Sequence, residues 1–82
     1  MREDVKGEMK ITVKLFATLR VGRFKIKEME YDESITVGQL VKLLGISEND
    51  LGIMFINGHH TGLDTELREG DTISIFPLVG GG

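Results

Sequence analysis

The sequence contains no cysteine and no tryptophan, and its only proline is Pro77. Without cysteine the chain can form neither a disulfide nor a thiolate metal site, and it offers no thiol nucleophile. No apolar run approaches the ~18 residues that a membrane-spanning helix needs. The first residues also lack the apolar stretch of a secretory signal. We therefore expect a cytoplasmic protein that does not bind membranes.

Lysine and arginine are in the minority, and the formal net charge is −3. Because nucleic-acid binding depends on dense positive charge, we do not expect a nucleic-acid partner. Residues 1–30 hold eight Lys or Arg against five Asp or Glu, whereas residues 31–82 hold two against eight. This acidic second part is either an ordinary solvated surface or a face that meets a basic partner protein.

Length and composition predict one small globular domain. The chain has 82 residues, of which 40% are apolar and 28% charged, a composition typical of folded proteins. A chain of this size buries only about 60% of its unfolded surface, so its core is thin. We expect residues 9–76 to form the domain, residues 1–8 to be a flexible leader and residues 77–82 to be a flexible tail.

Two early segments alternate between apolar and polar residues, as half-buried strands do. The first, residues 9–16, places its apolar side chains on one face: Ile11, Val13 and Leu15. The second, residues 24–31, alternates less regularly, because its apolar phase slips between Ile26 and Met29. We expect the two strands to form a hairpin, with a bulge or an exposed end where the phase slips.

A helix is predicted from Thr36 to Leu44. Four apolar residues in this segment recur with helical spacing and form one stripe: Val37, Leu40, Val41 and Leu44. Thr36 and Gln39 make a capping box, in which each side chain satisfies a free backbone N–H of the first turn. Gly45 follows as the residue that adopts the left-handed conformation at the helix end.

Three further strands are predicted after this helix. Residues 53–56 are continuously apolar and precede Asn57-Gly58, a pair typical of two-residue hairpin turns. A short strand around residues 59–61 completes that hairpin, and residues 72–76 form the last strand. One helix must cover one face of a mixed sheet of four or five strands, because only then do both apolar faces leave water. The order of elements therefore favours an α+β fold of the β-grasp, or ubiquitin-like, class.

The side chains contain no recognisable catalytic constellation. The two histidines, His59 and His60, are neighbours on a predicted strand, so they point to opposite faces and cannot bind one metal together. The carboxylates are scattered over turns and exposed positions, and no glycine-rich phosphate loop follows a strand. We expect this chain to bind no metal or cofactor itself and to catalyse no reaction alone.

The C-terminal end is the most unusual feature of the sequence. Three final glycines occur by chance in about one chain in 3,000, and here they are Gly80, Gly81 and Gly82. They are either an inert end or a thin thread that can enter a channel too narrow for side chains. A carboxylate is a poor acyl electrophile, so chemistry at Gly82 requires a partner that activates it, with ATP, as an acyl-adenylate. The activated carbonyl can then accept sulfur, an amine or a thiol.

Several motifs together resemble the MoaD/ThiS family of ubiquitin-like sulfur carriers. They are residues 13–20 (VKLFATLR), Ile56-Asn-Gly58, and residues 67–82, which combine a Gly-Asp turn, Phe-Pro and a terminal Gly-Gly. The resemblance runs from about Met9 to the end and is greatest to MoaD, the small subunit of molybdopterin synthase. It implies an E1-like enzyme that uses ATP to adenylate Gly82, and a sulfur donor enzyme that converts the adenylate to a thiocarboxylate. It also implies a large synthase subunit, which transfers two sulfurs to a pterin precursor.

The same resemblance assigns six partner-binding residues: Phe16, Arg20, His60, Phe76, Pro77 and Val79. Phe16 and Phe76 are implied to form an exposed apolar patch on the sheet face away from the helix. His60 is implied to lie at the edge of this patch, and Arg20 to make a polar contact near the tail. The alternation agrees, because both phenylalanines fall out of phase with the inward residues of their strands. The alternative is that both rings are buried.

Two other functions stay open. The same carrier chemistry can serve another acceptor, in thiazole synthesis, in tRNA thiolation or in attachment to lysines as a protein modifier. A β-grasp interaction module with inert glycines would need no activation at all. The length of the chain and residues 13–20 favour the small subunit of molybdopterin synthase.

Overall fold

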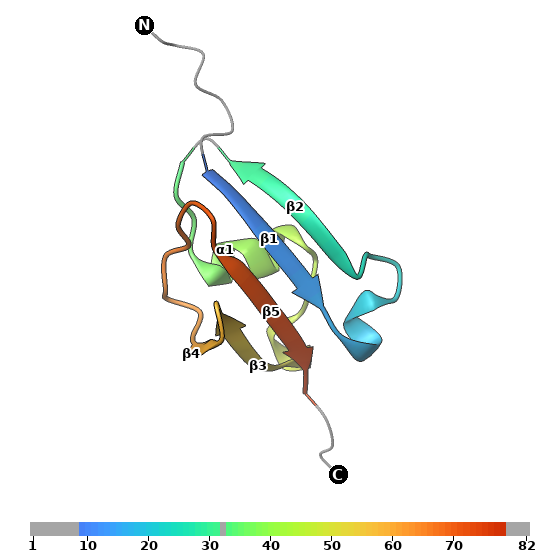
Figure 1. Cartoon of the computed structure of the whole chain (residues 1–82). Coiled ribbons are helices and arrows are strands. Elements are labelled where there is room, and N and C mark those ends of the chain that lie inside the picture. The colour runs from blue at the N-terminus through green and yellow to red at the C-terminus, as the bar shows by residue number, and fades with distance from the viewer. Residues whose placement is uncertain (1–8, 32, 79–82) are drawn as a thin grey trace, which may run out of the picture.

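The computed structural model describes residues 9–31 and 33–78, so the predicted leader and the last four residues lie outside the described part. Within that part the chain forms five strands and one α-helix (Figure 1). Their bounds are β1 Met9–Leu15, β2 Ile26–Tyr31, α1 Val37–Leu43, β3 Leu51–Ile56, β4 His59–Thr61 and β5 Thr72–Pro77. Two short 3₁₀ turns, η1 (Ala17–Arg20) and η2 (Glu48–Asp50), follow β1 and precede β3.

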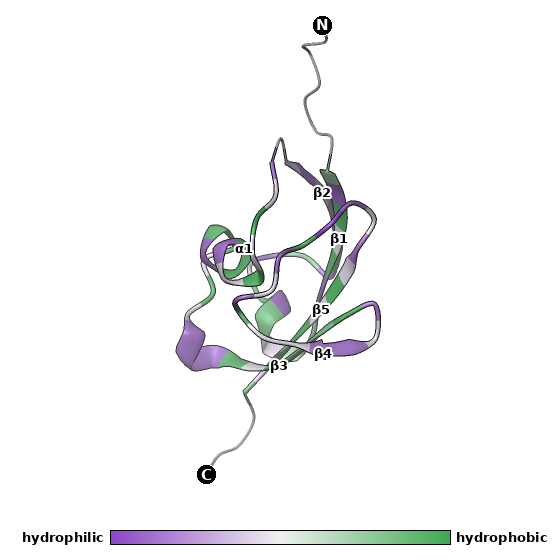
Figure 2. Ribbon diagram, turned by 90° about the vertical axis from the view of Figure 1, so that its left-hand side faces the viewer, coloured by the Kyte–Doolittle hydropathy of each residue, from purple (hydrophilic) through white to green (hydrophobic). Residues whose placement is uncertain are grey.

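The five strands form one mixed sheet in the order β2-β1-β5-β3-β4. The central pair, β1 and β5, is parallel, and the other neighbours are antiparallel. The helix α1 lies on one side of this sheet, behind β1 and β5 in Figure 1 and to the left of the sheet in Figure 2. This is the β-grasp arrangement predicted from the order of elements. None of the helices in the described part is long and apolar enough to cross a bilayer.

The helix begins and ends as predicted. The Gln39 N–H donates to Thr36 Oγ1 at 3.1 Å, and the Thr36 N–H donates to Gln39 Oε1 at 2.8 Å, which confirms the capping box. Gly45 has a φ of +73° and donates its N–H to the Lys42 carbonyl, which closes the last turn. The helix packs its stripe against the sheet through buried side chains: Val37, Leu40 and Val41.

One apolar core lies between the helix and the sheet. The inward residues of the two central strands are almost completely buried: Ile11, Val13, Leu15, Ile73 and Ile75. Burial of each such side chain stabilises the fold by about 1.5–3 kcal/mol before entropy is counted. The predicted inward phase of β1 and β5 is therefore confirmed.

The structure distinguishes between the two interpretations of the second strand. Pairing between β1 and β2 runs without interruption from Met9–Tyr31 to Lys14–Ile26, so the predicted bulge is wrong. Ile26 is 55% exposed, and the exposed-end interpretation is confirmed. β2 also starts at Ile26 rather than residue 24. The sheet does contain a shift of register, but it lies between Leu51 and Met54 of β3, opposite β5.

The predicted turn at Asn57-Gly58 is held by a network of side-chain hydrogen bonds. Both residues have positive φ, 51° and 85°, as a tight two-residue hairpin requires. The Asn57 side chain accepts from the Thr72 N–H at 3.0 Å and donates to Asp71 Oδ1 at 2.9 Å. Asp71 also accepts from the Arg68 N–H at 2.8 Å. The Asn-Gly and Gly-Asp motifs are thus explained by their contacts within the fold.

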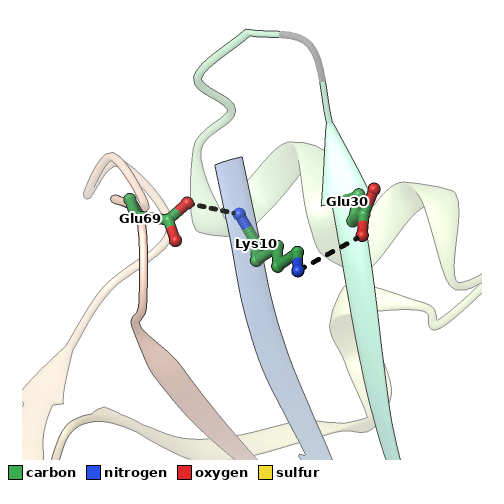
Figure 3. A network of polar contacts seen from close by, with 3 residues as sticks. All are labelled: Lys10, Glu30 and Glu69. Atoms are coloured by element: carbon green, nitrogen blue, oxygen red, sulfur yellow. Dashed lines mark hydrogen bonds and ion pairs between the residues drawn. The ribbon is translucent and has the colours of Figure 1, made fainter. Parts of the chain in front are cut away.

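Lys10 joins three segments at the opposite end of the sheet from the tail (Figure 3). Its backbone N–H donates to Glu69 Oε1 at 2.7 Å, and its Nζ lies 3.9 Å from Glu30 Oε2. The side chains of Lys10 and Glu30 are about half exposed, so the ion pair adds little to stability. The backbone bond to Glu69 instead fixes the start of β1 beside the turn that leads into β5.

Arg23 connects the loop before β2 to the end of α1. Its guanidinium donates to the carbonyls of Leu19 at 3.1 Å, Leu44 at 3.1 Å and Gly45 at 3.0 Å. The last two carbonyls lie at the negative end of the helix, where a cation is favoured. We expect Arg23→Ala to lower the free energy of unfolding by about 1–2 kcal/mol, measured by urea denaturation. Lys25→Ala, an exposed cation in the same loop, is the matched control, and an equal loss in both variants would contradict the prediction.

Candidate functional site

Four aromatic side chains from different parts of the chain contact one another on the sheet. We call this set, Phe16, Phe55, His60 and Phe76, the aromatic patch. The Phe16 and Phe76 rings are stacked, with centroids 4.2 Å apart and an angle of 11° between their planes. Phe55 meets Phe76 edge-on at 6.0 Å and His60 edge-on at 6.1 Å. Such arrangements of rings are mutually attractive.

The aromatic patch faces away from the helix. Leu15 and Ile75 are completely buried beneath the sheet, and the residues that follow them, Phe16 and Phe76, point to the opposite side. Both phenylalanines are only partly buried and lie outside the core cluster. In Figure 1 this is the face nearer the viewer, at the end of the sheet from which the C-terminal segment departs. Large apolar side chains outside a core are typical of binding surfaces.

Parallel pairing of β1 and β5 explains why the two phenylalanines meet. Leu15 is the partner of Ile75 in this register, so the next residue of each strand, Phe16 and Phe76, lies alongside the other. The Phe16 N–H also donates to the Ile75 carbonyl at 3.2 Å. The pair is therefore placed by the central strands of the sheet rather than by a loop.

Arg20 extends the aromatic patch with a positive charge. Its guanidinium carbon lies 5.4 Å from the centroid of the Phe16 ring, and its Nε donates to the Leu15 carbonyl at 2.7 Å. The backbone bond holds the side chain over the ring, where cation–π attraction is favourable. Arg20 thus lies at the Phe16 end of the patch, and two of the guanidinium's nitrogens have further donor capacity.

His60 occupies the far end of the patch, and Phe55 links it to the other rings. His60 contacts Phe55 edge-on, and both His60 and its neighbour His59 are exposed in the β3–β4 hairpin. Phe55 is not among the predicted site residues, because a continuous apolar run such as residues 53–56 has no alternation that distinguishes inside from outside. The turn supplied the missing signal: two turn residues at 57–58 place Phe55 directly opposite His60 on the same face.

The last strand leads from the aromatic patch to the tail. β5 includes Pro77, which pairs with Leu51, so the last strand extends one residue beyond the predicted 72–76. Proline lacks only the N–H donor, and pairing continues because the next residue supplies one: the Leu78 N–H donates to the Asp50 carbonyl at 2.8 Å. Leu78 is 63% exposed. The remaining predicted site residues, Val79 and residues 80–82, lie outside the described part.

The described side chains form no metal-binding group of three or more His, Cys, Asp or Glu residues. The patch contains apolar rings, one imidazole and an adjacent guanidinium, which suit contact with another protein rather than bond-making chemistry. This arrangement places a partly exposed aromatic surface beside a strand that ends at Pro77, two residues before the three final glycines.

Comparison with known proteins gives the family. The sequence model of the ThiS family matches residues 13–82, a span that includes the whole aromatic patch and the final glycines. A protein of Archaeoglobus fulgidus named as a sulfur carrier is 36% identical over 92 aligned positions, covering 90% of this chain and all of the relative.

Two solved structures have the same fold. A Pyrococcus furiosus protein named as subunit 1 of molybdopterin converting factor is 28% identical, with a TM-score of 0.70 over 87% of this chain and 99% of that one. Small archaeal modifier protein 1 from Methanosarcina acetivorans is 25% identical, with a TM-score of 0.67 over 90% of this chain and 97% of that one. From the extent of the family match and the shared fold, the chain belongs to the ThiS family.

Proposed function

We propose that this chain is a sulfur carrier whose reactive group is the carboxyl of Gly82, and that it acts as the small subunit of a molybdopterin synthase. The observation that carries the proposal is the aromatic patch at the end of the sheet where β5 leads into the glycine tail. Membership of the ThiS family supports it, as does the similarity to the Archaeoglobus protein and to the Pyrococcus converting-factor subunit.

The proposed chemistry begins with activation of a carboxylate. An oxygen of the Gly82 carboxylate attacks the α-phosphorus of ATP on an E1-like enzyme, and pyrophosphate leaves. A sulfide equivalent from a sulfur donor enzyme then attacks the acyl carbon, AMP leaves, and a thiocarboxylate remains. In the synthase the thiocarboxylate sulfur attacks a carbon of the pterin precursor, and a C–S bond forms as the C–O bond at that carbon breaks and its oxygen substituent leaves. Water then cleaves the resulting thioester and restores the Gly82 carboxylate.

The patch residues would supply binding in each of these steps. Phe16, Phe55 and Phe76 offer apolar area, and Arg20 and His60 offer polar contacts at its two ends. Aromatic and arginine side chains are the residues that most often dominate protein interfaces. The E1-like enzyme and the large synthase subunit would dock on the same surface in turn, because each must receive the same tail. Pro77 and Val79 would lie where the tail enters the partner.

The absence of cysteine makes the thiocarboxylate directly measurable. We expect part of the protein purified from its native host to be heavier by about 16 Da, since sulfur replaces one oxygen. Oxidation of one of the four methionines adds a similar mass, so mass alone is insufficient. A thiol-specific alkylating reagent distinguishes them, because the only sulfur nucleophile of that kind in the chain would be the thiocarboxylate. Protein from actively growing native cells that never reacts with the reagent would contradict the proposal.

A second candidate keeps the activation but changes the acceptor. The similarity to small archaeal modifier protein 1 favours attachment of Gly82 to lysines of other proteins. The last tryptic site of the chain is Arg68, so a conjugated lysine would carry residues 69–82 as a branch after digestion. Finding such branched peptides would support the modifier. Co-purification with a larger pterin-binding subunit, without branched peptides, would support the synthase subunit.

A further inference from the structure

We propose that Gly52 is a positioning residue for the tail: the absence of its side chain lets β3 lie against the Pro77–Leu78 peptide and so sets where and in which direction the tail leaves the sheet. The inference rests on the proposed function, because it concerns the tail that an activating enzyme would charge. It goes further by assigning part of that function to a residue remote from Gly82.

The backbone of β5 occupies the space that a side chain at Gly52 would need. A Cβ atom there would lie 2.7 Å from the Pro77 carbonyl carbon and 3.0 Å from the Phe76 carbonyl oxygen, and closer still to the Pro77 carbonyl oxygen. The obstructing atoms are main chain and cannot rotate away. The φ of Gly52 is not in the left-handed region, so lack of space, rather than backbone conformation, requires glycine here.

The segment that contains Gly52 also holds Pro77 and Leu78, the residues from which the tail leaves the sheet and which we call the root of the tail. Leu51 pairs with Pro77, and the register between β3 and β5 shifts after this pair, so Gly52 lies in a bulge. The carbonyl that Gly52 contacts and the N–H of Leu78 belong to the same peptide group. That N–H donates to the Asp50 carbonyl at 2.8 Å. Any displacement of the peptide by a side chain at Gly52 would therefore also disturb this hydrogen bond.

The position of the root matters because the tail is short. Four residues follow Leu78 in the sequence, and they span at most about 14 Å when fully extended. A partner bound to Phe76 holds the residue immediately before Pro77. The direction of the Pro77–Leu78 peptide then decides whether the Gly82 carboxyl reaches the reacting phosphate. Small errors in the placement of reacting atoms lower the rate of the reaction more than they weaken binding of the carrier to its partner.

The test compares Gly52→Ala with wild type in ATP–pyrophosphate exchange by the native host's E1-like enzyme. We expect turnover to fall about 10- to 100-fold, with the KM for the carrier within about threefold of wild type. Gly62→Ala is the matched control, because a Cβ at Gly62 meets no atom within 4 Å and its φ is not left-handed. Amide exchange gives an independent readout: Leu78 should lose protection in Gly52→Ala while core amides such as Ile73 keep theirs.

The outcomes separate this inference from the proposed function. If wild type and Gly62→Ala are charged and Gly52→Ala is charged equally well, the inference is overturned and the proposed function stands. A raised KM with unchanged turnover would also overturn it. If wild type itself is never charged, the proposed function fails, and the positioning role fails with it. A second variant covers the case in which Gly52→Ala does not fold: one glycine inserted after Leu78 should lower turnover similarly, and unchanged turnover would overturn the inference.

Discussion

A chain that lacks Gly81 and Gly82 is expected to fold normally and to lose sulfur loading completely. Its last carboxyl would belong to Gly80, about 7 Å of extended chain short of the original position. Adenylation requires the carboxylate within bonding distance of the α-phosphorus, so a deficit of this size should reduce charging by more than about 100-fold. Thiol-specific alkylation of protein from the native host measures the loss directly.

Leu78→Ala is the matched control for this truncation. It shortens an exposed side chain just before the tail but keeps the length of the tail and all three final glycines, so we expect loading to stay close to wild type. The fold should survive in both variants, because the apolar core is formed by residues between Met9 and Ile75. A truncated chain that still takes up the alkylating reagent, or that still supports cofactor synthesis in a strain lacking the full-length protein, would refute a reactive centre at Gly82.

Much of the fold could be predicted from the sequence, because its signals are local. The capping box of Thr36 and Gln39 needs only four residues, and the alternation of residues 9–15 identifies an inward face without knowledge of the partner strand. The Asn57-Gly58 turn is local in the same sense. These features were sufficient because one helix and a mixed sheet leave few ways to bury both apolar faces.

The features of the fold that the sequence does not predict arise where strands pair that lie far apart in the sequence. The bulge in β3 and the need for Gly52 arise where β3 meets β5, more than twenty residues later. No local pattern marks Gly52 as a position that needs glycine, since its φ lies outside the left-handed region and only the neighbouring strand excludes a side chain. Pairing of Pro77 was missed for the same reason.

The candidate site was predicted in part. The phase of the strands indicated that Phe16 and Phe76 leave the core, and the parallel register explains why they stack. Phe55 can be assigned to the patch only from its pairing with His60 across the β3–β4 turn. The roles of these residues in binding stay predictions, and the comparison of two adjacent positions on β5 tests them most directly.

Ile75 and Phe76 are consecutive residues that face opposite sides of the sheet, so replacing each by alanine should damage different properties. Ile75 is completely buried in the core, and Ile75→Ala should lower the free energy of unfolding by about 2–5 kcal/mol, measured by urea denaturation. Phe76 contacts the Phe16 and Phe55 rings outside the core. Phe76→Ala should cost only about 0.5–1.5 kcal/mol of stability, from the lost ring contacts.

The affinity for a partner should change in the opposite order, with a larger loss in Phe76→Ala than in Ile75→Ala. If Phe76 is an interface anchor, Phe76→Ala weakens binding to the E1-like enzyme by about 1–3 kcal/mol, or roughly 5- to 150-fold in Kd. Folded Ile75→Ala protein should bind as wild type does, because its change lies beneath the sheet. Calorimetric titration of both variants, at a temperature where both are folded, measures the difference. Equal losses of stability with unchanged binding would show that Phe76 serves the fold, and the aromatic patch would then need another explanation than docking.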